Sequence, residues 1–148
     1  MEKYEVVIIG AGPAGIGMSS MLKDFGLKKM LVVEKGKVGQ TFDMWPEEMR
    51  FITPSFTTNF WGQMDLNSIA TGTSPAFTLE TEHPSGKEYA KYLRTLSEHF
   101  ELPIKENTEV ENVKYIDNKF IINIKNHSPI KSRFLIWAAG EYQYPNLN

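Results

Sequence analysis

The chain has 148 residues, of which 41% are hydrophobic and 23% charged, as in an ordinary globular domain. Its formal net charge of −2 gives no electrostatic reason to expect nucleic acid or an anionic membrane as a partner. It contains no cysteine, which excludes a disulfide or thiol-based site within these residues, and no apolar run reaches the roughly 18 residues of a membrane span.

The amino-terminal 36 residues predict one β-α-β unit. The segment from Tyr4 to Ile9 is short and rich in valine and isoleucine, which is typical of a strand buried on both faces. It starts so close to Met1 that no room is left for a signal peptide, and we therefore expect a cytoplasmic protein. Met30 to Val33 predicts a second buried strand. Between them Pro13 suits a first helical turn, Gly26 suits its end, and apolar residues recur at helical spacing: Met18, Met21, Leu22 and Phe25.

The segment from Val38 to about Thr81 lacks periodicity but is rich in aromatic residues. Segments of this length without regular structure are usually functional loops or disordered linkers. So many aromatic side chains require burial, so we expect an ordered loop region packed over another part of the protein. The residues concerned are Phe42, Trp45, Phe51, Phe56, Phe60, Trp61 and Phe77.

Regular structure returns with a helix that begins after Ser85. Ser85 and Glu88 have the S-x-x-E spacing of a capping box. An apolar stripe at helical spacing follows it: Tyr89, Tyr92, Leu93, Leu96 and Phe100.

Short strands fill the rest of the chain. Pro103 to Lys105 predicts one, and Thr108 to Ile116 with Lys119 to Lys125 predicts a hairpin across Asp117 and Asn118. A strand around Pro129 to Lys131 would complete a small antiparallel meander. A separate buried strand, Phe134 to Trp137, then leads into Ala138-Ala139-Gly140.

The glycines after the first strand have the spacing of a dinucleotide-binding loop. Gly10, Gly12 and Gly15 form G-x-G-x-x-G, and Glu34 ends the second strand about twenty residues later. In such a loop the first glycine allows the turn, the second allows close approach of a pyrophosphate, and the third allows the helix to pack on the strand. The carboxylate accepts hydrogen bonds from ribose hydroxyls and repels a 2′-phosphate. The sequence therefore predicts a dinucleotide site that disfavours NADP.

The organisation of the whole chain resembles the FAD half of flavoproteins with two dinucleotide-binding domains, and within them the flavin-containing monooxygenase-like and Baeyer–Villiger-like group. The resemblance is carried by GAGPAG, VVEKG, VGQTFDMWP, TTNFWG, HPSGKEYAKYL, NTEVENV and FLIWAAGEYQYPN. It implies an α/β, Rossmann-like FAD-binding domain with a central parallel sheet and a small antiparallel β-meander. Ala139 replaces the usual threonine of the last motif, and Gln40 and Phe42 depart from the family's G-G-x-W stretch.

The resemblance also implies a set of site residues. Glu34 would bind the adenosine ribose, Lys35 would lie close to the adenine, and Val110 would meet the adenine edge. Asn59 matches an asparagine that lies beside the flavin, where it is associated with the oxygen-derived intermediate. The pyrophosphate would be held by Gly10, Gly12, Pro13, Ala14 and Gly15, with Ala138 and Gly140 nearby. The flavin side would run along Gln40, Thr41, Phe42 and Trp45.

Relatives of this kind carry a second glycine-rich motif for NAD(P)H and a carboxyl-terminal FAD strand, and these 148 residues contain neither. We therefore expect residues 1–148 to be an FAD-binding portion, inactive alone, of a flavin-dependent oxidoreductase that acts on a small-molecule substrate. A homo-oligomer is compatible with the sequence. No metal site is expected, because His83, His99 and His127 lack ligand spacing. Two alternatives stay open: a NAD-binding module or sensor without flavin chemistry, and a thioredoxin-reductase-like flavoprotein half.

Overall fold

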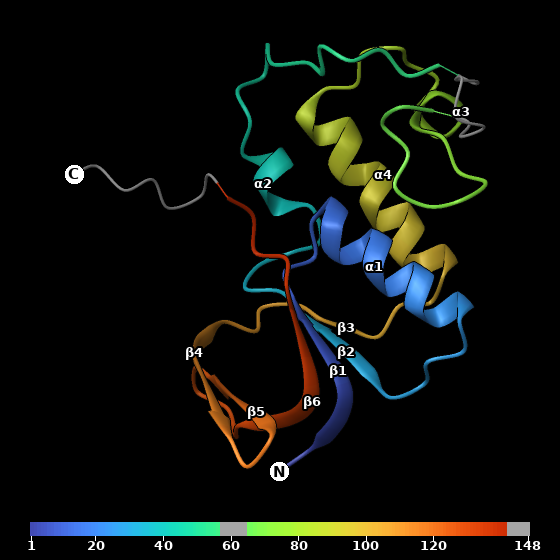
Figure 1. Cartoon of the computed structure of the whole chain (residues 1–148). Helices are drawn as coiled ribbons and strands as arrows, with labels where there is room; N and C mark the ends of the chain where they lie inside the picture. Colours follow the sequence, from blue (N-terminus) through green and yellow to red (C-terminus); the bar gives the residue numbers. More distant parts are fainter. Residues whose placement is uncertain (57–64, 142–148) are drawn as a thin grey trace.

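The computed structural model describes residues 1–56 and 65–141 and has an α/β fold built on one six-stranded sheet (Figure 1). Three strands run parallel to β1 (Lys3–Ile9), namely β2 (Met30–Val33), β3 (Ile104–Lys105) and β6 (Ile130–Trp137). Two more continue the sheet in antiparallel fashion, β5 (Lys119–Ile124) beside β6 and β4 (Val110–Ile116) at the edge. The strand order is β3-β2-β1-β6-β5-β4, which confirms the predicted fold class.

Within the described residues four helices accompany the sheet: α1 (Pro13–Asp24), α2 (Gln40–Asp43), α3 (Pro75–Leu79) and α4 (Gly86–His99). In Figure 1, α1 and α4 lie on one side of β1 and β2, and the sheet curves so that β4 and β5 lie toward the other side of these strands. This arrangement buries both faces of β1. Val6 and Ile8 belong to the cluster that includes the α1 and α4 side chains, and Val7 and Ile9 pack with residues of β5 and β6.

The helix α1 forms where expected but buries a different face. Met21 is 53% exposed and Phe25 82% exposed, and Met18 is exposed too, so that of the apolar stripe that predicted the helix only Leu22 packs against the core. The buried residues are instead Gly15, Ile16, Ser19 and Ser20. The small Gly15, Ser19 and Ser20 allow close packing, and the two serine hydroxyls donate to the carbonyls of residues 16 and 17, which offsets the cost of burying them. Gly26 follows the helix with a φ of +84°, as predicted for a terminating glycine.

The strand β6 differs from the two short strands that the sequence indicated. The sequence predicted one strand around Pro129 to Lys131 and a separate one from Phe134 to Trp137, but the strand runs without interruption from Ile130 to Trp137. It is continuous because it pairs on both sides, with β1 along its length and with β5 over its first half. Ser132 is buried between its two neighbours, Tyr4 and Phe120. The meander is therefore an extension of the main sheet.

The aromatic region is partly ordered as expected. Phe42, Trp45 and Phe51 pack with their ring centroids 5.0–5.8 Å apart, and Phe51 lies 4.4 Å from Tyr89 of α4. Phe56 and Phe77 are exposed, so the expectation of burial is wrong for them. Phe60 and Trp61 lie outside the described residues. The short helices α2 and α3 occur within the segment for which no regular structure was predicted.

The predictions for α4 and the hairpin are confirmed. Ser85 caps α4 in a complete capping box with Glu88, and Tyr89, Tyr92, Leu93 and Leu96 are buried. The hairpin turns at Asp117 and Asn118, whose positive φ angles of 50° and 56° are those of a type I′ turn.

Candidate cofactor site

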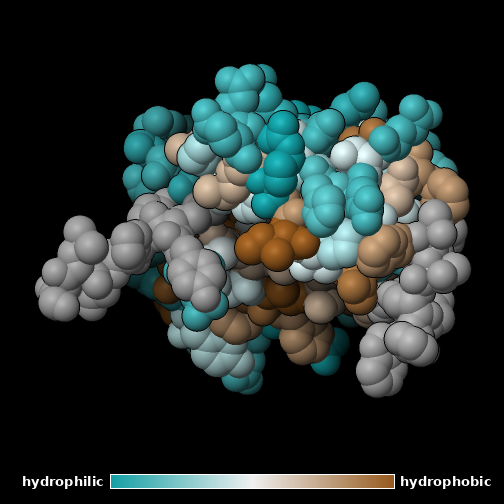
Figure 2. Space-filling model, turned by 90° about the horizontal axis from the view of Figure 1, so that it is seen from above, coloured by the Kyte–Doolittle hydropathy of each residue, from teal (hydrophilic) through white to brown (hydrophobic). Residues whose placement is uncertain are grey.

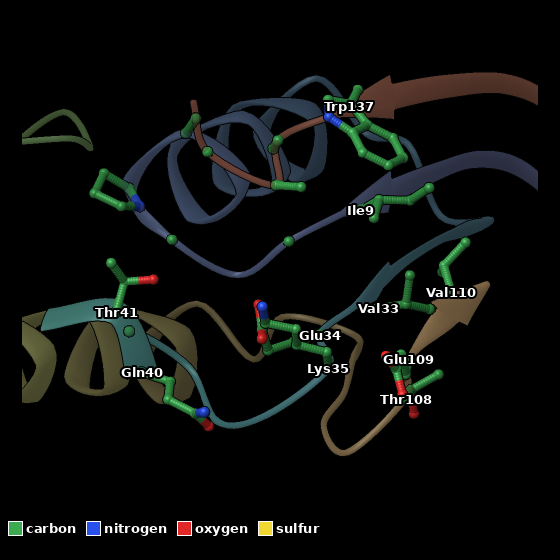
Figure 3. A pocket seen from close by; sticks show the side chains of 18 of the residues that line it. Ile9, Val33, Glu34, Lys35, Gln40, Thr41, Thr108, Glu109, Val110 and Trp137 are labelled. Atoms are coloured by element: carbon green, nitrogen blue, oxygen red, sulfur yellow. The ribbon is translucent and has the colours of Figure 1, made fainter. Parts of the chain in front are cut away.

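A cavity of about 1000 Å³ lies at the carboxyl ends of β1, β2 and β6 (Figure 3). In an open α/β sheet this edge is where ligands bind, because the loops that follow parallel strands converge there. Figure 2 looks down on this edge and shows hydrophobic surface gathered in the centre of the face. The cavity is lined by the glycine loop, the end of β2, the start of α2, the entry into β4 and the exit from β6.

The three glycines of the loop have different surroundings. Gly10 has a φ of +105°, and a β-carbon there would overlap the carbonyl of Ala138. A β-carbon on Gly15 would overlap the carbonyl of Gly10, so Gly15 holds α1 against the loop and does not line the cavity. Gly12 lines the cavity, and a β-carbon there would meet no atom within 4 Å. Gly12 therefore leaves space for a ligand to approach the main chain.

The first turn of α1 supplies hydrogen-bond donors to this space. Gly12 is the N-cap residue, Pro13 occupies the first helical position, and no side chain caps the helix. The first N–H groups of a helix have no intrahelical partner, and the helix dipole adds positive potential at this end. Gly12, Pro13 and Ala14 line the cavity, so this end of α1 fits an anion such as a pyrophosphate.

Glu34 connects the glycine loop to the segment that follows β2. One of its carboxylate oxygens accepts the N–H of Ala11 at 2.8 Å, and the other accepts the N–H of Gly36 at 2.9 Å. A carboxylate offers about four acceptor positions, so two remain for ribose hydroxyls. Glu34 and the adjacent Lys35 both line the cavity. Glu34 therefore fixes the loop and also presents acceptors to a ligand.

Val110 presents main-chain groups at the same cavity. It pairs with Ile124, and the Lys125 N–H donates to the Glu109 carbonyl at 2.9 Å. In an antiparallel ladder this arrangement makes Val110–Ile124 a non-hydrogen-bonded pair, so the N–H and C=O of Val110 point away from β5. They point outward because β4 is the edge strand. A base with adjacent donor and acceptor groups fits such an edge.

The opposite end of the cavity is formed by the start of α2. Gln40, Thr41 and Phe42 line it there, and the Gln40 side-chain oxygen accepts the Lys37 N–H at 3.0 Å. Trp45 does not line the cavity, because its ring packs against Phe42 and Phe51. Asn59 lies outside the described residues.

The structure therefore brings twelve of the fifteen predicted site residues to one cavity: Gly10, Gly12, Pro13, Ala14, Glu34, Lys35, Gln40, Thr41, Phe42, Val110, Ala138 and Gly140. It adds lining residues that sequence reasoning missed, among them Ile9, Val33, Met44, Thr108, Glu109 and Trp137. Ile9, Val33 and Trp137 are the last residues of their strands, and the rule that ligands bind at carboxyl ends of parallel strands could have identified them.

An ion pair lies at the rim of the cavity. Lys125 lies 2.8 Å from the Glu109 carboxylate, and its hydrogen bond and charge lower the pKa of Glu109, with a smaller effect from Lys35. Both partners of the pair are about half exposed, so its contribution to stability is small.

Within residues 1–56 and 65–141, no group of three or more histidine or acidic side chains could hold a metal ion. The helices in these same ranges are all too short or too polar to cross a membrane.

Comparison with known proteins gives consistent relatives. The family model for pyridine nucleotide-disulphide oxidoreductases matches residues 7–148. The uncharacterized oxidoreductase CzcO of Bacillus velezensis is 30% identical over 147 residues, which are 97% of this chain and 38% of that protein. The bacillithiol disulfide reductase of Staphylococcus aureus is 28% identical with a TM-score of 0.74, over 95% of this chain and 39% of its own.

Two further solved structures share the fold at lower identity. A flavin-containing monooxygenase from Stenotrophomonas maltophilia has a TM-score of 0.71 and 17% identity, over 94% of this chain and 39% of its own. The OTEMO complex with FAD and NADP has a TM-score of 0.71 and 23% identity, over 98% of this chain and 27% of its own. In every case the chain spans well under half the length of its relative.

Proposed function

This chain belongs to the pyridine nucleotide-disulphide oxidoreductase family, whose model matches residues 7–148. From this membership and from the cavity we propose that the chain is the FAD-binding portion of a flavin-dependent oxidoreductase, monooxygenase-like and reduced by NAD(P)H in the whole protein. One observation carries the proposal: Gly12, the uncapped start of α1, Glu34 and the outward main chain of Val110 all border a single cavity.

The residues present fit FAD along the length of this cavity. Gly12 and Ala14 would hold the pyrophosphate, to which the first-turn N–H groups would donate. Glu34 would accept the ribose hydroxyls, and its charge would disfavour a 2′-phosphate, so the site would select FAD or NAD over NADP. Gln40 and Phe42 at the start of α2 would border the flavin end. Bound FAD supplies the hydride and electron transfer of the reaction, and the chain binds and orients it.

The monooxygenase-like assignment rests on the sequence resemblance and on the shared fold of the flavin-containing monooxygenase from Stenotrophomonas maltophilia. A second candidate, a flavin-dependent disulfide reductase, is favoured by the 28% identity to the bacillithiol disulfide reductase of Staphylococcus aureus. These 148 residues contain no cysteine, so a reacting thiol in such an enzyme would be supplied from elsewhere. Oxygen uptake and disulfide reduction, assayed with NADPH on the protein extended to its relatives' length, separate the two candidates.

The FAD proposal is tested on the chain itself by absorption spectroscopy and calorimetry. We expect the purified chain, mixed with FAD and passed through a desalting column, to retain visible flavin absorption bands, and FAD to raise its melting temperature more than NAD does. A colourless chain that is stabilised only by NAD would favour a NAD-binding module instead. A chain that responds to neither compound would overturn the proposal.

A further inference from the structure

Three side chains form a row across the floor of the cavity. Val33, Ile9 and Trp137 are the last residues of β2, β1 and β6, and they are cross-strand neighbours in the parallel register. Alternation along β1 and β6 puts Ile9 and Trp137 on the same face of the sheet. Val110 packs against the cluster that contains Val33 and Ile9. The four residues therefore surround one end of the cavity (Figure 3).

Trp137 differs from the other two residues of this row because most of its side chain is exposed to solvent. Val33 is 1% exposed and Ile9 is 7% exposed, whereas Trp137 is 66% exposed although it lines the cavity beside them. An indole is among the largest apolar surfaces that a residue can bury. Its aromatic face also stacks on nucleobases regardless of their identity.

The neighbouring groups indicate which ring packs there. Val110 directs a main-chain N–H and C=O away from β5 at this end of the cavity, and Glu34 and Lys35 lie between this end and α2 (Figure 3). A purine with a hydrogen-bonding edge matches Val110, and a ribose on the adjoining side matches Glu34. A flavin ring would lie instead toward α2, beyond the first turn of α1.

We propose that Trp137 is a stacking wall for the adenine of the bound dinucleotide, with the base packed against the indole and its edge bonded to the Val110 main chain. The inference rests on the proposed function and adds a positioning residue to it. It follows that the adenine half of the cofactor, represented by ADP, binds this chain without the flavin.

The test uses calorimetric titration of the chain with ADP, FMN and FAD. Replacing Trp137 with alanine should weaken ADP and FAD binding by about tenfold or more, within the range for loss of one base–aromatic stack, and leave FMN binding unchanged. Trp137→Phe should restore most of the affinity because it retains an aromatic face. Phe134→Ala is the matched control: Phe134 is an exposed aromatic residue on the same strand and does not line the cavity, so ADP affinity should not change.

A fluorescence measurement on the unmodified chain provides a check that does not depend on any variant. ADP absorbs almost no light at 295 nm, so a decrease in indole emission on adding ADP reports contact with the base, and we expect this decrease to disappear in Trp137→Phe. If ADP binds but Trp137→Ala binds it equally well, or if emission does not change, the stacking role is wrong while the proposed function survives. If neither ADP nor FAD binds the unmodified chain, both are wrong.

Discussion

Gly12 and Gly15 belong to one motif, but a methyl group would have opposite consequences at the two positions. At Gly12 a β-carbon would project into the cavity and contact no protein atom, and the backbone φ of −83° suits any residue. At Gly15 it would overlap the Gly10 carbonyl that packs against α1. The first position therefore leaves the cavity open, and the second lets α1 pack on the loop.

We expect Gly12→Val to weaken FAD binding by at least about tenfold, about 1.4 kcal/mol, because the side chain would push a pyrophosphate away from the first-turn N–H groups. The free energy of unfolding should fall by no more than about 1 kcal/mol, the effect of replacing glycine at an N-cap. Urea unfolding and a calorimetric FAD titration measure the two quantities separately. Gly15→Ala is the comparison and should lower stability substantially. Equal FAD affinity in Gly12→Val and the unmodified chain would contradict the predicted cradle.

The place of a single residue in the cavity could be predicted where a sequence motif with fixed spacing contains it. It could not be predicted where it depends on which strand lies alongside. The glycines and Glu34 could be identified because a fixed motif links each one to a role. The exposure of Trp137 could not be, since it depends on which strand lies beside β6 and on how β4 closes the cavity. The hydrogen bonds by which Glu34 accepts the Ala11 and Gly36 N–H groups were not predictable either, because they depend on how the glycine loop folds back onto the end of β2.

The start of α4 is held by a capping box that contains a titratable side chain, the carboxyl group of Glu88. The Glu88 side chain accepts the Ser85 N–H and hydroxyl, both at 2.7 Å, and these bonds hold the pKa of Glu88 below its usual value. A carboxyl whose folded pKa is lowered stabilises the fold above its unfolded pKa, near 4.5, and the contribution is lost as the pH falls below that value.

Ser85→Ala should therefore reduce the free energy of unfolding by about 1 kcal/mol at pH 7, and the difference from the unmodified chain should narrow below about pH 4.5. Glu88→Gln is the control, because an amide preserves the capping-box geometry but does not titrate. Urea unfolding monitored by circular dichroism between pH 3 and pH 7 measures both. A difference between Ser85→Ala and the unmodified chain that stays constant over this range would contradict a contribution from the hydrogen bond between the Ser85 hydroxyl and the Glu88 carboxylate.

Elements with a local signal were predicted well, and elements that form through long-range packing were not. The capping box and the Asp117-Asn118 turn are encoded within a few residues, and both were found where expected. The two halves of β6 join only because β1 and β5 pair with the strand from opposite sides. Likewise, α2 is only four residues long, which is too short for a periodic sequence pattern. Contacts with α4, including the ion pair of Asp43 with Arg94, hold it in place.

At the scale of the whole molecule, the described residues provide one cavity with the features of a dinucleotide site, and the sequence contains one G-x-G-x-x-G motif. Hydride transfer between a nicotinamide and a flavin requires both rings to be held about 3–3.5 Å apart. Under the proposed function FAD would occupy this cavity, and the described residues would then offer no second dinucleotide site to hold NADPH against the flavin.

We therefore expect this chain, supplied with FAD, to oxidise NADPH no faster than an equal concentration of free FAD. The decrease in NADPH absorbance at 340 nm measures the rate, and the same assay with Gly12→Val gives the background for a chain that binds the cofactor more weakly. A protein as long as the relatives of this chain, with a second glycine-rich motif, should exceed the free-FAD rate by orders of magnitude. Binding of both cofactors to one protein converts their bimolecular encounter into an oriented reaction. Turnover by the 148-residue chain well above free FAD would mean that a nicotinamide site exists within it, and the assignment of this chain as the cofactor-binding portion alone would then be wrong.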